Sequence, residues 1–197
     1  MDMYAYERYL AGENTPFCGV DEAGRGPLAG PVCAAAVILP DGLVIPGLND
    51  SKKLTAKKRD ALYDIICESA VAFGIAFATV DEIEALNIKG ATYLAMNRAI
   101  ADMEPAPALA LVDGNDKNEL DIPAIKVVKG DSLCASIAAA SVLAKVTRDR
   151  YMEDMDALYP QYGFAKHKGY GTAAHIAALK EYGPTPIHRR SFIKNFV

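Results

Sequence analysis

The sequence predicts an α/β fold in which a mixed β-sheet is flanked by helices. Short apolar segments predict strands at residues 17–21, 32–39, 71–80, 108–112 and 124–128. Three of these come early in the chain, whereas the last two alternate with helical patterns, an order that indicates a mixed sheet covered by helices. The chain has 197 residues, 51% of them hydrophobic, which is enough for the core of one domain.

The first predicted strand ends on acids. Its apolar run leads to two adjacent carboxylates, Asp21 and Glu22, and then through a glycine-rich turn at 24–26 to the strand at 32–39. Acidic residues are poor strand formers, and two adjacent carboxylates repel each other. A bound divalent cation usually offsets such repulsion, since hard cations such as Mg²⁺ prefer carboxylate oxygens. The glycines of the turn would also let backbone groups approach a ligand closely.

Helical patterns fill most of the remaining chain. A helix predicted over 55–69 begins with a threonine cap, and one over 88–103 stops before Pro105. An alanine-rich pattern predicts a long helix over 133–158, whose small side chains allow close packing on a sheet. A further amphipathic helix is expected over 172–182, where a Gly-Pro pair ends it.

Two further acids lie where predicted elements end or begin. Asp113 follows the fourth strand, Asp131 precedes the long helix, and a polar loop is expected over 114–121 between them. Taken singly, Asp113 before a glycine is typical of a turn and Asp131 before a serine is typical of a helix start. The ends of neighbouring parallel strands line one edge of a sheet, so a parallel arrangement would bring both acids to Asp21. At the start of the long helix, the helix dipole would favour ionised Asp131.

Positive charge is concentrated in two segments of an otherwise acidic chain. The net charge is −4, but residues 49–59 carry a net +4 and residues 161–197 a net +5, which leaves −13 for the remainder. This distribution is typical of a protein that binds phosphates through particular segments, although two ordinary solvent-exposed surfaces would give the same distribution of charge. The four cysteines are scattered without a CxxC pair, so we expect reduced thiols rather than disulfides or a zinc site.

A set of motifs follows in order along residues 17–192. They are Asp21-Glu22-Ala23-Gly24-Arg25-Gly26, Asn49-Asp50-Ser51-Lys52-Lys53-Leu54, Val112-Asp113-Gly114, Lys129-Gly130-Asp131, Ile137-Ala138-Ala139-Ala140-Ser141, Ala144-Lys145-Val146-Thr147-Arg148-Asp149, His167-Lys168-Gly169-Tyr170-Gly171-Thr172 and His188-Arg189-Arg190-Ser191-Phe192. In this combination the chain resembles type 2 ribonuclease H, the ribonuclease HII family. Each motif alone is weak or moderate evidence, and together they are specific.

The resemblance implies a ribonuclease H-like fold, a five-stranded mixed sheet with a helical C-terminal portion. It implies an endoribonuclease that hydrolyses the RNA strand of RNA–DNA hybrids and incises 5′ of ribonucleotides embedded in duplex DNA, leaving 3′-OH and 5′-phosphate ends. Hydrolysis would use two divalent ions, Mg²⁺ or Mn²⁺, about 3.5–4 Å apart. The residues implied as both catalytic residues and metal ligands are Asp21, Glu22, Asp113 and Asp131.

The resemblance also implies how the nucleic acid is bound. The glycine-rich turn would contact the ribose 2′-OH, which distinguishes RNA from DNA, and Tyr170 would pack against the next deoxyribose. The implied substrate-binding residues are Gly24, Arg25, Gly26, Ser51, Lys52, Lys53, Lys168 and Tyr170, and Arg189 and Arg190 are further candidates for phosphate contacts. We expect one domain over 1–197 whose basic C-terminal part, about 160–197, is a helical extension that contacts substrate.

Two alternatives stay open from the sequence. Ribonuclease HIII is a related enzyme that usually carries an extra N-terminal substrate-binding domain, for which about 16 residues before Phe17 leave no room. A non-catalytic nucleic-acid- or cation-binding module on the same fold would not require a two-metal cluster of four acids. Because no secretory signal or apolar stretch of transmembrane length is visible, we expect a cytoplasmic protein without a membrane partner. We also expect a monomer.

Overall fold

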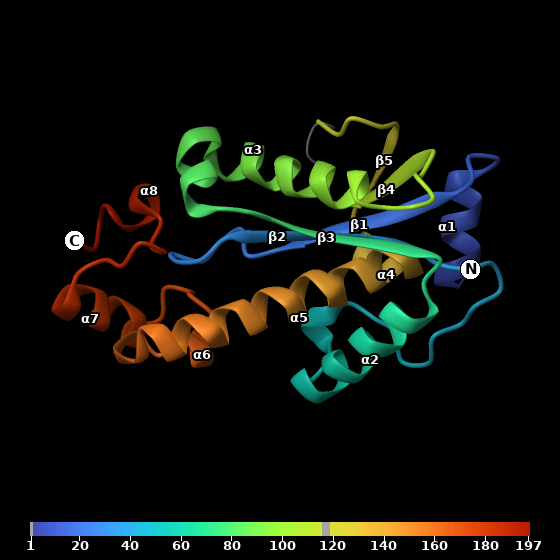
Figure 1. Cartoon of the computed structure of the whole chain (residues 1–197). Helices are drawn as coiled ribbons and strands as arrows, with labels where there is room; N and C mark the ends of the chain where they lie inside the picture. The colour runs from blue at the N-terminus through green and yellow to red at the C-terminus, as the bar shows by residue number, and fades with distance from the viewer. Residues whose placement is uncertain (1, 116–118) are drawn as a thin grey trace.

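The computed structural model describes residues 2–115 and 119–197 (Figure 1). It confirms the five-stranded mixed sheet flanked by helices, with the strand order β3-β2-β1-β4-β5. The strands are β1 (Phe17–Ala23), β2 (Val32–Ile38), β3 (Ala72–Ala78), β4 (Leu109–Asp113) and β5 (Ala124–Val127). The helices are α1 (Met3–Ala11), η1 (Ser51–Lys53), α2 (Ala56–Ser69), α3 (Val80–Ala101), α4 (Gly130–Leu133), α5 (Ala135–Leu158), η2 (Pro160–Tyr162), α6 (Phe164–His167), α7 (Ala173–Tyr182) and α8 (Arg190–Ile193).

Strand direction decides which side chains meet at the edge of the sheet. β1 pairs antiparallel with β2, and β2 with β3, whereas β4 lies parallel to β1 and β5 parallel to β4. The register places Val20 of β1 opposite Val112 of β4. The next residues, Asp21 and Asp113, are therefore neighbours on the same face of the sheet. This is the parallel arrangement that the sequence argument required.

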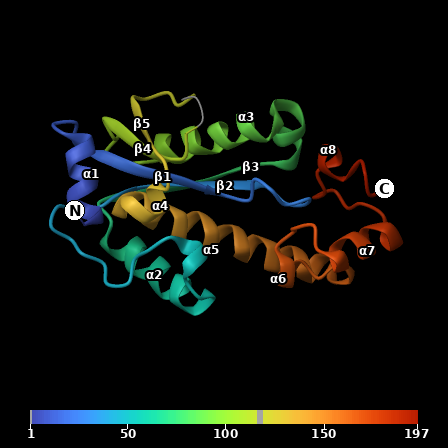
Figure 2. The ribbon, with the colours of Figure 1, turned by 180° about the vertical axis from the view of Figure 1, so that it is seen from behind.

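Helices cover both faces of the sheet. α3 crosses one face, and α5 crosses the other with α2 packed beside it (Figures 1 and 2). β2 is buried along its whole length because both of its faces are covered. Its side chains alternate between the two layers, so that Ala34 joins the core under α3 and Ala35 joins the core under α5.

Small residues allow α5 to lie close to the sheet, as its alanine-rich sequence predicts. A Cβ added at Gly19 of β1 would lie 2.1 Å from the backbone carbonyl carbon of Ser136 in α5. Ala138, Ala139 and Ala140 of the same helix are fully buried. Any side chain at Gly19 would push the helix away, so this contact fixes the position of α5 relative to the acids of β1.

The long helix begins later than predicted. The chain first forms the short helix α4, which contains Asp131, and then becomes extended at Cys134 (φ −123°, ψ 128°) before α5 starts at Ala135. Asp131 therefore lies in a separate short helix, and the expectation that it stands at the start of the long helix is wrong.

Other boundaries also differ from the predictions. α3 begins at Val80 rather than residue 88, because Thr79 and Glu82 form a capping box that also ends β3 early. A kink at Asn87 (φ 59°, ψ 170°) divides α3, and only the part after the kink was predicted. α1 was not predicted, although Asp2 is a recognisable N-cap whose carboxylate accepts a bond from an amide of its first turn.

The C-terminal portion is helical, as expected, and gathers beyond one end of the sheet (Figure 1). The predicted loop over 114–121 includes residues 116–118, which lie outside the described residues. Within the described residues, no helix is both long enough and apolar enough to cross a membrane.

Candidate active site

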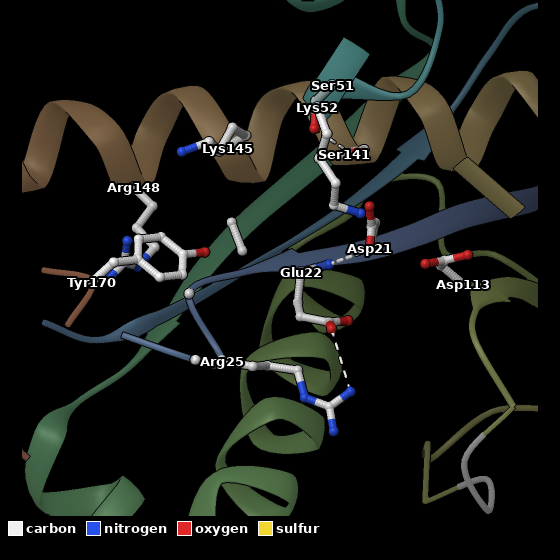
Figure 3. A pocket seen from close by; sticks show the side chains of 13 residues that line it. Asp21, Glu22, Arg25, Ser51, Lys52, Asp113, Ser141, Lys145, Arg148 and Tyr170 are labelled. Atoms are coloured by element: carbon white, nitrogen blue, oxygen red, sulfur yellow. Dashed lines mark hydrogen bonds and ion pairs between the residues drawn. The ribbon is translucent and has the colours of Figure 1, made fainter. Parts of the chain in front are cut away.

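A pocket of about 260 Å³ opens where β1 ends, beside the middle of α5 (Figure 3). Side chains reach it from two strands, from η1, from α5 and from the segment before α7. The lining residues are Asp21, Glu22, Ala23, Gly24, Arg25, Gly26, Ser51, Lys52, Asp113, Ser141, Lys145, Arg148 and Tyr170. Most of the predicted site residues therefore meet at one cavity, although they are spread over about three quarters of the sequence.

Three aspartates form what we call the acid cluster. One carboxylate oxygen from each of Asp21, Asp113 and Asp131 lies within 4.8 Å of the others. Asp21 and Asp131 are only 4% and 6% exposed. Parallel pairing of β1 with β4 brings the first two together, and the short helix α4 adds the third. Convergent carboxylate oxygens at this spacing can hold a hard divalent cation.

The charges of the acid cluster oppose one another. Burial, followed by the neighbouring charges of Glu22 and Asp113, raises the pKa of Asp21 well above its usual value. Burial and the charge of Asp131 raise the pKa of Asp113. The amide of Gly130 offsets part of this effect by donating to Asp113 Oδ1 at 2.7 Å. The cluster thus disfavours its own ionised form in the absence of a cation.

Glu22 stands apart from the three aspartates. Its carboxylate points to the opposite side of β1, where the guanidinium of Arg25 lies 3.5 Å away (Figure 3). Burial raises the pKa of Glu22, and Arg25 partly opposes that rise. Of the four acids named from the sequence, three are therefore clustered, and Glu22 borders the same pocket from the side of the glycine-rich turn.

A lysine side chain reaches the acid cluster from η1. Asp50 caps this short helix by accepting from the amide of Lys52, and the Lys52 ammonium then lies 3.2 Å from Asp131 Oδ2. Burial lowers the pKa of Lys52, but the bond to Asp131 and the charge of Asp21 outweigh it, so the pKa is raised on balance. Lys52 thus supplies one positive charge to a group of three acids.

The neighbours of Lys52 are held differently. Lys53 points toward α4, where its ammonium donates to the Ser132 hydroxyl at 2.9 Å. Ser51 is buried, and its hydroxyl lies 2.7 Å from that of Ser141 on α5. Ser51 lines the pocket, whereas Lys53 lies beside it, so the structure places the segment at the site but gives its three residues different surroundings.

The residues after β1 form what we call the glycine turn (24–31), and a buried arginine fixes its shape. All three nitrogen positions of the Arg189 guanidinium donate to turn carbonyls: Nε to Gly30 at 2.9 Å, Nη1 to Arg25 at 2.8 Å and Nη2 to Gly24 at 2.6 Å. Arg189 is 0% exposed. The expectation that Arg189 contacts phosphate is therefore wrong, because its side chain is buried and its nitrogens donate to backbone carbonyls of the glycine turn.

A second buried arginine, Arg148 of α5, holds the other side of the glycine turn. It donates to the carbonyls of Ala29 at 3.1 Å and Pro31 at 3.0 Å, and to that of Lys168 at 3.0 Å. Gly24 has φ +96°, and a Cβ there would lie 2.0 Å from Arg148 Nε. Only glycine is compatible with both the conformation and this contact, which explains one glycine of the motif.

The two residues predicted near the C-terminus differ in placement. Tyr170 is 46% exposed and lines the pocket, where its ring lies beside the glycine turn (Figure 3). The Lys168 ammonium turns away from the pocket, toward Glu153 at 2.6 Å and the carbonyl of Ala165 at 2.8 Å. The structure therefore brings Tyr170, but not the charged end of Lys168, to the pocket.

Sequence reasoning did not identify the part of the site that α5 contributes. Ser141, Lys145 and Arg148 all line the pocket, one turn apart along the helix. The signal was present, because residues at i, i+4 and i+7 share one face of a helix. Burial lowers the pKa of Lys145, while its 2.6 Å bond to Asp149 opposes this effect.

Comparisons with known proteins agree with this geometry. The family model of ribonuclease HII matches residues 18–195. A ribonuclease HII from Dechloromonas aromatica is 62% identical over 175 residues, which cover 89% of this chain and 89% of that protein. Among solved structures, ribonuclease H2 from Pyrococcus horikoshii matches with a TM-score of 0.73 at 26% identity, over 89% of this chain and 92% of that one.

A more distant structure, Bst ribonuclease HIII in complex with Mn²⁺, shares the fold, with a TM-score of 0.64 at 18% identity over 85% of this chain and 62% of that one. The family match spans nearly the whole chain and includes the pocket described above. The chain belongs to the ribonuclease HII family and is a ribonuclease H, a metal-dependent endonuclease.

Proposed function

We propose that the protein hydrolyses the RNA strand of RNA–DNA hybrids and incises duplex DNA on the 5′ side of embedded ribonucleotides, leaving 3′-OH and 5′-phosphate ends. The observation that carries the proposal is that Asp21 and Asp113 of the acid cluster line one pocket with the glycine turn and Tyr170, while Asp131 adjoins these two acids. A phosphate at the acids would thus have its ribose within reach of the turn, which suits a nuclease that reads sugars rather than bases.

The donor set of the pocket fits divalent cations. Asp21, Asp113 and Asp131 would hold them, with Glu22 as a further ligand from the opposite side of the pocket. Burial, together with the charges of neighbouring acids, raises the pKa of Asp21, Glu22 and Asp113. When bound, two ions, Mg²⁺ or Mn²⁺, would activate the attacking water and stabilise the leaving oxygen of the phosphodiester. We propose these four acids as the catalytic residues.

We propose that the glycine turn recognises the ribose of the substrate. The backbone of Gly24, Arg25 and Gly26 lines the pocket, and the two buried arginines hold it in place before substrate arrives. A preorganised backbone contact to the 2′-OH costs little entropy on binding. The turn would therefore distinguish a ribonucleotide from a deoxyribonucleotide without reading the base.

The other proposed contacts surround this centre. Tyr170 would pack against the deoxyribose that follows the ribonucleotide, which suits its half-exposed ring at the pocket wall. Lys52 and Lys53 on η1 would contact phosphate, with Ser51 beside them. The Lys168 ammonium would have to break its ion pair with Glu153 before it could contact a phosphate.

We further propose that the chain acts as one domain and as a monomer in the cytoplasm, with residues 160–197 as a basic extension along the substrate. The contacts between Arg189 and the glycine turn support a direct role for this extension in shaping the site. The four free cysteines, three of them buried, suit a reducing compartment.

A cleavage assay tests the proposed function. The substrates are an end-labelled DNA duplex with a single ribonucleotide, a hybrid with a long RNA tract and an all-DNA duplex, each with Mg²⁺, Mn²⁺ or chelator. We expect metal-dependent cleavage 5′ of the ribonucleotide and cleavage within the RNA tract, with the all-DNA duplex intact. Binding of the hybrid without cleavage under any metal would instead indicate a non-catalytic module.

A further inference from the structure

Three histidines lie together next to the backbone of Tyr170, where α6, α7 and the segment before α8 meet. His175 and His188 are 0% and 1% exposed, and their Nε2 atoms lie 3.0 Å apart. His167 stacks on His175 with ring centroids 4.5 Å apart. None of the three lines the pocket of the acid cluster, so their arrangement requires a separate explanation.

The partners of the buried pair fix where each proton lies. His175 Nδ1 lies 2.9 Å from the carbonyl oxygen of Tyr170, which can only accept, so this nitrogen carries a proton. The amide of Thr185 donates to His188 Nδ1 at 2.9 Å, so that nitrogen is bare and the proton of His188 lies on Nε2. The two assignments fit together, because His188 Nε2–H then donates to the bare Nε2 of His175.

The histidines hold the chain on both sides of the Tyr170 side chain. His175 binds the Tyr170 carbonyl, and the amide of Gly169 donates to His167 Nδ1 at 3.2 Å. The Gly169 carbonyl accepts from the amide of Leu28 in the glycine turn at 2.9 Å. The ring of Tyr170 is exposed and its own backbone is fixed, so the direction of the ring depends on these bonds.

We propose that His175 and His188 are positioning residues that orient Tyr170 over the pocket and thereby set the preference for a ribonucleotide–deoxyribonucleotide junction over a continuous RNA tract. The inference rests on the proposed function. In a long RNA tract the sugar that follows the contacted ribonucleotide is again a ribose, so a correctly placed Tyr170 contributes most where that following sugar is deoxyribose. The pair acts through Tyr170 and does not touch the reacting atoms.

The surroundings keep the pair neutral. Burial, followed by the charge of His175, lowers the pKa of His188 to about 4, and burial lowers the pKa of His175 as well. The titratable and charged groups that face the pair are His167 of α6, the Tyr162 ring of η2 and Arg190 of α8, and none of them carries negative charge near neutral pH. The proton arrangement described above is therefore maintained at neutral pH.

Two polar variants separate the bonds of His175. Asparagine places its amide near the Nδ1 position and can still donate to Tyr170, whereas glutamine reaches the Nε2 position and can only serve His188. The test measures kcat and KM of wild type, His175→Asn and His175→Gln on the single-ribonucleotide duplex and on the long-tract hybrid. The control on the same helix is Lys180→Gln, because Lys180 is exposed on α7 and lies outside the described bonds to Tyr170.

We expect His175→Gln to lower the junction-to-tract ratio of kcat/KM about 10-fold, His175→Asn to keep it within about 3-fold of wild type, and Lys180→Gln to leave it unchanged. His188→Leu, which removes the partner of His175, should shift the ratio in the same direction and replaces His175→Gln if that variant does not fold. An unchanged junction-to-tract ratio in the folded variant, or an equal change in the control, overturns the proposal about the histidines. In that case, cleavage of both substrates by wild type still supports the proposed function. Cleavage of neither substrate by wild type overturns both.

Discussion

Two regions of this molecule bury like charges side by side, and they differ in what surrounds those charges. In the acid cluster, the carboxylates of Asp21, Asp113 and Asp131 converge, and their repulsion contributes to the raised pKa values of the first two. Around the glycine turn, Arg148 and Arg189 are equally buried, yet each donates three hydrogen bonds to backbone carbonyls. Buried like charge therefore does not by itself indicate a functional site; the available partners do.

The comparison predicts opposite outcomes when one charge is removed from each region. The carboxylates of the acid cluster repel one another, and the fold offers too few positive charges to offset this repulsion. Removing one of these carboxylates should therefore stabilise the folded state. The arginines are fully engaged, so losing one should leave buried carbonyls unpaired. The variants below follow from this contrast, from the largest expected effect to the smallest.

Asp21→Asn should show the largest effect, a loss of cleavage of about 10³-fold, because it removes a proposed metal ligand at the reacting phosphate. Without divalent ions, the same change should raise the melting temperature, since it removes a buried charge that its neighbours repel. Cleavage rates and metal-free thermal melts measure the two effects. Asp154→Asn, at an exposed acid of α5, is the control. A fall in the melting temperature of Asp21→Asn would indicate that the acid cluster stabilises the fold instead.

Arg189→Met should destabilise the protein by about 3–5 kcal/mol, because three buried carbonyls of the glycine turn lose a charged donor. Denaturant unfolding measures the change. Arg190→Met alters the exposed neighbouring residue and should change the free energy of unfolding by less than about 0.5 kcal/mol. Equal effects of the two changes would show that Arg189 does not determine the conformation of the turn.

Acid should weaken the histidine-linked region. The unfolded chain protonates His188 near its usual pKa of 6.5, whereas the folded protein holds that pKa at about 4. The unfolded state therefore binds more protons between these values, so stability falls as the pH drops through this window. At pH 5 the loss from His188 is about 2 kcal/mol relative to pH 7.

The raised pKa values of the acid cluster act in the opposite direction, so wild type must be compared with a variant that keeps the acids. His188→Gln serves this purpose, and metal-free denaturant unfolding at pH 7 and pH 5 measures both proteins. Wild type should lose about 2 kcal/mol more than the variant over this interval. Parallel pH dependence of the two proteins would contradict a neutral buried His188.

Lys52→Met should have the smallest effect, a tightening of Mn²⁺ binding by about 5-fold in the absence of substrate. The Lys52 ammonium lies 3.2 Å from Asp131 but is largely exposed, so solvent screening limits the change to about 1 kcal/mol. Titration calorimetry measures the affinity. Lys53→Met is the matched control, because that lysine binds the Ser132 hydroxyl instead. Weaker Mn²⁺ binding to Lys52→Met would show that the lysine supports the cation rather than competing with it.

The sequence predicted the sheet and the position of the acids well, because both follow from local patterns. A buried strand leading to an acid appears at both Asp21 and Asp113, and the parallel pairing that joins them agrees with the order of strands and helices. The separate helix that carries Asp131 could not be read in this way. The break at Cys134 lies within a continuous helical pattern and depends on how α4 packs.

The buried arginines show why the remainder was not predicted. Arg189 lies in a basic segment, and a basic residue in such a segment is usually exposed because burying its charge is costly. Only the carbonyls of the glycine turn, far away in sequence, make burial favourable. The pairing of Lys168 with Glu153 is tertiary in the same sense. The separation of Glu22 from Asp21 is instead local, because consecutive side chains of β1 point to opposite faces of the sheet.

The contact between Arg189 and the glycine turn also has a consequence for biosynthesis. Arg25 and Arg189 are 164 residues apart. At translation rates of about 5–20 residues per second, the ribosome needs roughly 10–30 s after making the turn to make the residue that fixes its shape. All four acids are synthesised well before that moment. A nascent chain therefore carries its four acids long before Arg189 is available to fix the conformation of the glycine turn beside them.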